Sequence, residues 1–256
     1  MGHGDHIVIP KSILKRFMGK DKKVISFNLK SGEIKRDFPD AIFTQSNYYS
    51  EDVDKFIKDK SETIIGNLYH SIKQDNKKIK IEDIINMKNI FILQHFRNRS
   101  FTKKLSNQYP YLKNIFHNMA LKSLINSYLD NAGRIDNNIE IELKEIYKYI
   151  ENMYNKFTPG FLLLKDTEST LILPSTQFCF FTYKGYETYL YTIAPDVALI
   201  WVRYPQKKDF EYAETNENDA VEKINSLIIA TELKDNTDNM IFVLEDELNR
   251  ICNKNK

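Results

Sequence analysis

The feature that most constrains the fold of this chain is a change of pattern at Thr158-Pro159-Gly160. Before this point, apolar residues recur at the spacing of amphipathic helices. After it, they fall in short runs rich in β-branched and aromatic side chains, which are typical of strands. A helical part over about residues 50–157 and a sheet part over about residues 160–250 therefore predict an α+β fold with a mostly antiparallel sheet.

At the N-terminus, Lys11–Met18 is predicted to form a short amphipathic turn or helix, and Lys23–Leu29 and Glu33–Arg36 a β-hairpin. The helices expected in the central bundle are Val53–Ile72 with Ser50 as N-cap, Glu82–Phe101, Tyr111–Asp130 and Ile139–Asn155. The expected strands are Phe161–Lys165, Thr170–Leu173, Phe178–Tyr183, Glu187–Ile193, Val197–Arg203 and Met240–Leu244, with a flanking helix at Ala220–Glu232. Since no long linker or internal repeat interrupts the chain, we expect a single domain over residues 1–256.

Charge and cysteine usage narrow the class of protein. The 37 Lys and Arg residues nearly cancel the 35 Asp and Glu residues, which excludes a polycation of the histone type but allows a local basic groove. Cys179 and Cys252 have no zinc-binding or redox spacing, so we expect two reduced thiols. The N-terminus lacks an apolar signal core, and no apolar run reaches the roughly 20 residues of a membrane span. These features predict a cytoplasmic protein.

Standard catalytic motifs are absent: the chain has no Gly-rich phosphate loop, Gly-x-Ser-x-Gly, His-Glu-x-x-His or Cys-x-x-Cys. The clearest anomaly lies in the second expected helix, where Gln94 and Arg97 share a face with Ile90 and Phe101. A guanidinium inside a bundle needs anionic or carbonyl partners, because stranding it costs several kcal/mol. Two interpretations follow: a cleft that binds an anion such as phosphate, or a structural ion pair with a carboxylate of the first helix.

Basic residues continue beyond Arg97. Arg99 and Lys103-Lys104 flank Phe101, and this mixture of cations and an aromatic ring can track a nucleic-acid backbone or simply form a solvated helix surface. Glu62 falls at the edge of the apolar stripe of the first helix, where a solvated position is the simpler interpretation.

The histidines offer one further candidate. His6 precedes an extended apolar segment, so its ring is either packed structurally or available for catalysis. The other helical histidines have no ligand spacing and are interpreted as structural; they are His70, His95 and His117.

Several short motifs occur in a fixed order along the chain. It opens with His-x-x-x-Pro-x-x-x-Leu-x-x-Phe, formed by His6, Pro10, Leu14 and Phe17. The later motifs are Asn47-Tyr48-Tyr49, Glu62, Gln94-His95-Phe96-Arg97, Asn225 and Ile241–Leu244. Over nearly its whole length the chain therefore resembles the bacterial domain-of-unknown-function family 4238.

Two positions depart from the pattern of that family. Arg99 stands where the family usually has a proline. The stretch Pro174-Ser175-Thr176-Gln177-Phe178 lacks the aspartate and the proline of the family's Thr-Ser-Asp-x-Pro. Threonine cannot replace a carboxylate as a general acid or as a metal ligand, so an altered or degenerate site is one implication.

The positions that the resemblance picks out imply a phosphodiester hydrolase, RNase- or DNase-like, that serves as a defence or toxin-type effector. In this hypothesis His6 is the general acid or base, Glu62 orients or assists it, and Arg97 holds the phosphate. The substrate-binding residues are Gln94, Arg99 and Asn225, and the expected partner is a nucleic acid. No metal ligands and no cofactor are assigned.

The alternative is a binding or sensor module without chemistry, in which the same polar residues form a structural network. The missing carboxylate at Thr176 and the absence of standard catalytic motifs favour it. The two hypotheses differ in whether His6, Glu62, Gln94 and Arg97 converge at one place in the fold.

Overall fold

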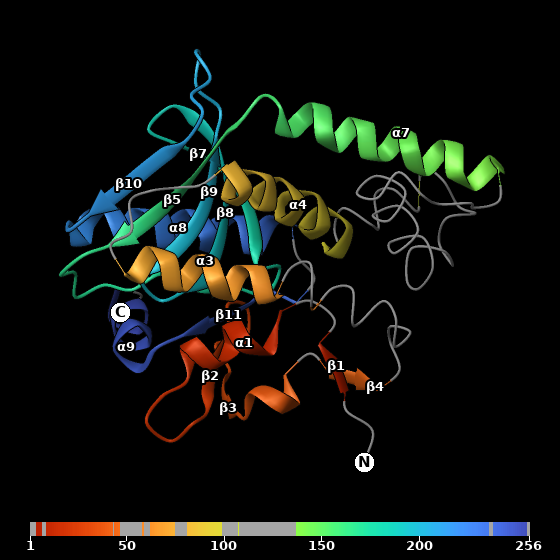
Figure 1. Ribbon diagram of the computed structural model, residues 1–256. Helices are drawn as coiled ribbons and strands as arrows, with labels where there is room; N and C mark the ends of the chain where they lie inside the picture. The colour runs from red at the N-terminus through yellow and green to blue at the C-terminus, as the bar shows by residue number, and fades with distance from the viewer. Residues whose placement is uncertain are drawn as a thin grey trace.

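A five-stranded sheet forms the centre of the fold, as the computed structural model in Figure 1 shows. The structure describes residues 4–6, 9–42, 44–46, 58, 62–74, 81–98, 107, 137–235 and 238–254. The strand order of the sheet is β10-β5-β9-β8-β7, and only the β10–β5 pair is parallel. Its strands are β5 (Thr158–Leu164), β7 (Phe178–Tyr183), β8 (Tyr186–Ala194), β9 (Val197–Val202) and β10 (Glu211–Thr215).

Helices lie on both faces of this sheet (Figure 1). One face packs against α3 (Thr63–Lys73), α4 (Ile81–Arg97) and α7 (Asn137–Tyr154), and the other against α8 (Asn218–Asp235). Side chains alternate along each strand, so Phe161 and Leu163 of β5 enter the first core and Leu162 and Leu164 enter the second. Because both faces are covered, the central strands are apolar nearly throughout.

A second sheet, of order β3-β2-β11-β6, joins the two ends of the chain. Its strands are β2 (Val24–Asn28), β3 (Ile34–Asp37), β6 (Leu173–Pro174) and β11 (Met240–Val243). Around it lie α1 (Lys11–Leu14), η1 (Lys15–Phe17), η2 (Pro39–Ala41), α9 (Glu245–Lys254) and the small pair β1 (Gly4–His6) and β4 (Thr44–Ser46).

The α+β class, the N-terminal hairpin and the mostly antiparallel C-terminal sheet with its flanking helix are confirmed. Some boundaries were predicted wrongly. The strand expected from Phe161 already begins at Thr158, and the helix expected to reach Phe101 ends at Arg97, because Asn98 is not helical. The helix expected at Tyr111–Asp130 and the N-cap expected at Ser50 lie outside the described residues.

The segment Thr170–Leu173 was predicted to be a strand, but only Leu173 and Pro174 pair with β11. The reason is local: the backbone N–H groups of Thr170 and Ile172 donate to the side chains of Glu247 and Asn225 instead of to a strand. The strand β10 and the helix α9 were not predicted. Among the described helices, none combines the length and the apolarity that crossing a membrane requires.

Candidate functional site

Tyr191 occupies the centre of a buried polar cluster between the five-stranded sheet and the α3–α4 face. It lies in β8, and none of its surface is exposed. Burial raises the pKa of Tyr191 well above its ordinary value, and the nearby Glu62 raises it further. Arg97, Arg16 and Gln177 act in the opposite direction and lower this pKa. The phenol therefore stays protonated at neutral pH and keeps an O–H to donate. We call these five residues the Tyr191 cluster.

Arg97 enters the cluster from the last residue of α4, and its side chain is 5% exposed. Gln94 lies three residues earlier on the same helix face and is buried too. The Gln94 Nε2 group has no hydrogen-bond partner in the structure, within the part of the chain that is described. The predicted pair Gln94 and Arg97 is thus internal, and α4 presents it toward the sheet that carries Tyr191.

Glu62 and Arg16 bring opposite charges to the same hydroxyl. Glu62 is half-buried at the residue immediately before α3, and its electrostatic effect on Tyr191 places it near the cluster. Arg16 in η1 donates from Nη1 to the carbonyl of Ile193 over 2.9 Å, and its guanidinium carbon lies 4.2 Å from the centre of the Tyr69 ring. Burial lowers the pKa of Arg16, and Tyr69, Tyr191 and Asp196 raise it; the guanidinium remains charged.

Gln177 is the most unusual member of the cluster. Its backbone φ is +61°, a left-handed value that costs a residue with a Cβ about 1 kcal/mol or more. The side chain is fully buried beside the Tyr191 hydroxyl, but the two groups do not reach the geometry of a full hydrogen bond. Within the described residues, neither atom of the Gln177 amide has a hydrogen-bond partner. A strained backbone and an unsatisfied amide at one residue are typical of a binding site.

Two of the other predicted site residues cannot be placed in the cluster. His6 belongs to β1, where it pairs with Thr44, and only its backbone is described. Arg99 lies outside the described residues, as do Lys103-Lys104 and Phe101. Roles for His6 and Arg99 therefore stay predictions.

Asn225 was expected to bind substrate together with Arg97, but the structure places it on the opposite face of the five-stranded sheet, in α8. Its Oδ1 accepts from the Ile172 N–H, and its Nδ2 donates to the Thr170 carbonyl and to Glu247. Both the oxygen and the nitrogen of the Asn225 side-chain amide are thus bonded to other groups of the protein. We therefore do not include Asn225 in the Tyr191 cluster.

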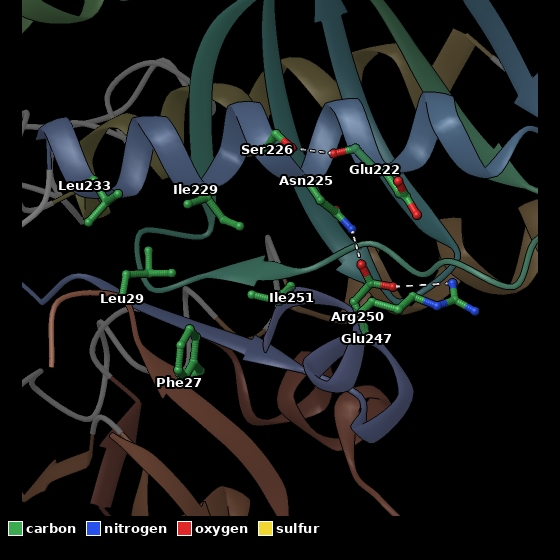
Figure 2. A pocket seen from close by; sticks show the side chains of 10 residues that line it. All are labelled: Phe27, Leu29, Glu222, Asn225, Ser226, Ile229, Leu233, Glu247, Arg250 and Ile251. Atoms are coloured by element: carbon green, nitrogen blue, oxygen red, sulfur yellow. Dashed lines mark hydrogen bonds and ion pairs between the residues drawn. The ribbon is translucent and has the colours of Figure 1, made fainter. Parts of the chain in front are cut away.

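Asn225 instead lines a cavity of about 420 Å³ between α8, α9 and the end of β2. Figure 2 shows the apolar side chains at one end of this cavity and Asn225, Glu247 and Arg250 at the other. Arg250 donates to Ser169 over 2.6 Å and lies 3.9 Å from Glu247. The polar end is thus a network that ties α8 and α9 to the loop before β6.

Thr176, where the family pattern has an acid, contacts a carboxylate from elsewhere in the chain. Its Oγ1 donates to Glu232 of α8 over 3.4 Å, and Ser175 donates to the same carboxylate. Glu232 is 1% exposed and also accepts from the Met240 N–H. This turn therefore has a carboxylate beside it, supplied by α8.

His95 lies two residues before Arg97 in α4, and its ring is buried among aromatic side chains. Its Nδ1 is 2.8 Å from the Phe91 carbonyl, and the ring packs against Phe178 and Tyr189. Burial lowers the pKa of His95 to about 4, so the ring is neutral at pH 7. Within the described residues, no three His, Cys, Asp or Glu side chains are grouped so that they could hold a metal ion.

Sequence reasoning missed Tyr191, Gln177 and Arg16. Tyr191 falls in a strand with many aromatic residues, and Arg16 lies between Leu14 and Phe17 of the opening motif. Neither pattern distinguishes a buried functional group from ordinary core or surface. Gln177 lies in the stretch that departs from the expected pattern, but it occupies the variable position of that pattern, so it too carried no signal of its own.

The arrangement is suited to an anionic ligand. Arg16 and Arg97 supply two guanidinium groups, Tyr191 supplies a protonated hydroxyl, and Gln94 and Gln177 supply amide donors without partners among the described residues. Donors outnumber acceptors, and Glu62 is the one carboxylate among the six residues named. Guanidinium and amide N–H groups of this kind bind phosphate oxygens.

Comparison with protein families identifies one match, to a model described as "Protein of unknown function (DUF4238)", over residues 6–231. Comparison with curated proteins and with solved structures gives no match. The matched range takes in the opening motif, the Gln94–Arg97 helix and the Tyr191 cluster. Since it covers nearly the whole chain, this protein belongs to the DUF4238 family.

Proposed function

We propose that this protein binds a phosphodiester in the Tyr191 cluster and hydrolyses it, with RNA or DNA as the substrate class. The observation that carries the proposal is the burial of Gln94 and Arg97 on α4, together with the 2.9 Å hydrogen bond from Arg16 to the Ile193 carbonyl of β8, the strand that holds Tyr191. Burial is the main cause of the raised pKa of Tyr191, and the nearby charges of Arg97, Glu62 and Arg16 act on it too. Charged groups are expensive to bury, and titratable groups with strongly perturbed pKa values and specific charged neighbours cluster at functional sites.

Each residue has a role in this proposal. Arg97 and Arg16 bind the non-bridging oxygens of the phosphate, and Tyr191 donates a hydrogen bond to the charge that develops on them. Glu62 accepts a proton from water as the new P–O bond forms. The bond from phosphorus to the leaving oxygen then breaks, and His6 is the candidate that protonates that oxygen. A role as an effector in defence or as a toxin would follow from cleavage of cellular or phage nucleic acid.

The second candidate function is a binding or sensor module without chemistry. It is favoured by burial: Gln94, Arg97 and Tyr191 are each at most 5% exposed. Under this alternative the cluster stabilises the contact between α4 and the sheet, and removing Arg97 weakens the fold by several kcal/mol because its partners are stranded.

One experiment separates the two candidates. The purified protein is incubated with labelled single- and double-stranded RNA and DNA, with and without Mg²⁺ or Mn²⁺, beside the variants Arg97→Lys and His6→Ala. Arg36→Ala is the matched control, because Arg36 is exposed and pairs with Glu245 on the surface.

The hydrolase proposal is supported if the wild type cleaves a substrate and the rate falls about 100-fold in Arg97→Lys, while this variant keeps the melting temperature of the wild type. Full activity in His6→Ala removes His6 from the mechanism while leaving the others in place. If no substrate is cleaved and Arg97→Lys lowers only the melting temperature, the hydrolase proposal is rejected in favour of the structural network.

A further inference from the structure

A second cavity, of about 240 Å³, opens on the α8 face of the five-stranded sheet. Its floor is apolar and comes from three neighbouring strands, with Leu162 of β5, Leu190 of β8 and Ile200 of β9. Leu190 and Ile200 are direct cross-strand partners, so their side chains lie together on one face. Tyr191 points to the other face of the same sheet, so this cavity is separate from the Tyr191 cluster.

Three tyrosines form the wall of this cavity, which we call the tyrosine pocket. Tyr183 and Tyr186 flank the turn between β7 and β8 and pair with each other across it. Lys184 and Gly185 in that turn both have positive φ, as a two-residue hairpin turn requires. Tyr204 follows β9, and its ring centre lies 5.0 Å from that of Tyr186 in an edge-to-face arrangement. The pocket thus joins an aliphatic floor to a wall of aromatic rings.

Three charged residues lie in or beside the tyrosine pocket. Glu211 of β10 lines the wall with 22% of its side chain exposed, and it accepts a 2.8 Å hydrogen bond from Lys208, which is 55% exposed. The Lys208 ammonium also lies 4.6 Å from the centre of the Tyr204 ring. Lys184 lines the pocket too, with its ammonium 5.4 Å from the centre of the Tyr183 ring. One carboxylate and one ammonium group therefore belong to the lining, and a second ammonium group pairs with that carboxylate.

We propose that the tyrosine pocket binds one base of a nucleotide or of a single-stranded nucleic acid. Its volume is below the roughly 300–1,000 Å³ of pockets for drug-sized ligands, and it suits a single planar ring system. Tyrosine rings stack on any base because every base has a π face. Glu211 accepts hydrogen bonds from the N–H groups of the base, and Lys184 and Lys208 bind the phosphate that leaves the pocket with it.

A single aliphatic or aromatic side chain of a protein partner would also fill the floor, but it offers no anion for the Lys184 ammonium and no N–H for the acceptor sites of Glu211 that Lys208 leaves open. The charge pattern at the mouth therefore favours the nucleotide. This proposal goes beyond the phosphodiester hydrolase and does not depend on it, because the two sites lie on opposite faces of the sheet.

Fluorescence anisotropy of a labelled single-stranded octanucleotide tests the proposal. The arms are the octamer as DNA, the octamer as RNA, an abasic octamer with the same phosphates, and unlabelled nucleoside monophosphates as competitors. We expect the normal octamers to bind at least ten-fold more tightly than the abasic one. Competition by a monophosphate at a concentration similar to that of the octamer identifies a free nucleotide as the ligand; competition only by the octamer identifies a strand.

The variants Tyr186→Ala and Tyr204→Ala should each weaken binding of the octamer about ten-fold, since each removes a stacking ring. Tyr149→Ala is the matched control, because Tyr149 is 64% exposed on α7, a helix that packs on the opposite face of the sheet from the pocket. Gel analysis of the recovered octamer checks that it is still intact, which separates binding in the pocket from cleavage elsewhere. Equal affinity for normal and abasic octamers, or unchanged affinity in both tyrosine variants, overturns the proposal.

Discussion

The side-chain amide of Asn225 donates a 2.9 Å hydrogen bond to the carboxylate of Glu247 and so joins α8 to α9. The same amide accepts from the Ile172 N–H and donates to the Thr170 carbonyl, so it also holds the backbone before β6. Glu247 is 4% exposed and also accepts from the Thr170 N–H. One amide and one carboxylate thus satisfy the polar groups of three segments within a largely apolar region.

Replacement of Asn225 should therefore affect stability. Asn225→Ala leaves the Ile172 N–H, the Thr170 carbonyl and one oxygen of Glu247 without this partner, which should lower the free energy of unfolding by about 2–4 kcal/mol. Urea denaturation measures the change. Ser226→Ala, at the exposed neighbour on the same helix, should change it by less than about 0.5 kcal/mol. A stable Asn225→Ala protein with impaired ligand binding would restore Asn225 to the substrate site.

His95 should make stability depend on pH below neutrality. Its pKa is about 4 in the folded protein and about 6.5 when unfolded, so between these values the unfolded chain binds more protons. Stability therefore rises with pH through this window and falls by up to about 3 kcal/mol as the pH drops from 6.5 to 4.

The variant His95→Asn isolates this effect, because its amide can donate to the Phe91 carbonyl as Nδ1 does but does not titrate. Denaturation at several pH values should show a smaller slope for His95→Asn than for the wild type. His70→Asn, on the exposed side of α3, should keep the slope of the wild type. Equal slopes in all three proteins would show that the buried ring is not responsible.

Tyr191→Phe removes one oxygen from the centre of the cluster. Within the described part of the chain, the Tyr191 hydroxyl has no hydrogen bond of full geometry, so its loss should change the free energy of unfolding by less than about 1 kcal/mol. Hydrolysis or phosphate binding should fall about 10- to 100-fold, since the hydroxyl is a donor to the anion. Calorimetry and the nucleic-acid cleavage assay measure the two effects. A large loss of stability with unchanged binding would assign the hydroxyl to the fold.

Two glycines should respond in opposite ways to alanine. A Cβ at Gly160 in β5 would lie 2.3 Å from the backbone oxygen of Glu211, so Gly160→Ala must push β10 away and should cost about 2–4 kcal/mol. A Cβ at Gly66 in α3 would meet no atom within 4 Å. Gly66→Ala should therefore raise the free energy of unfolding by up to about 1 kcal/mol. Thermal unfolding compares the pair. Because Glu211 lines the tyrosine pocket, Gly160→Ala should also weaken base binding.

The sheet was largely predictable because most of its strands are short, rich in apolar residues and separated by clear turns, as in β7 and β9. The strand β10 was missed because Glu211–Thr215 is half-polar and pairs in parallel, so it carries neither a hairpin signal nor an apolar run. Its partner β5 was predicted too short because Pro159 usually ends a strand. Pro159 is accommodated because β10 pairs only from Gly160 onward, so the strand has a free edge at the proline.

The site was only partly predictable, for a different reason. The spacing of Gln94 and Arg97 showed that two polar groups share a helix face, and the structure buries both. Glu62, Arg16 and Arg97 all influence the pKa of Tyr191 because three distant segments pack near β8. A local sequence pattern carries no information about that packing. The acidic first turn of α9, in contrast, was a visible helix signal that was not used.

The position of β11 has a consequence for how the chain folds during synthesis. In the four-stranded sheet β11 lies between β2 and β6, and Met240 pairs with Asn28. At about 5–20 residues per second, a ribosome needs on the order of 10–40 s to make the stretch between them. Throughout that interval one edge of β2 has no strand to pair with, although Val24 and Ile25 are core residues. Nascent chains that stall before residue 240 are thus the form of this protein that a chaperone or a protease should engage.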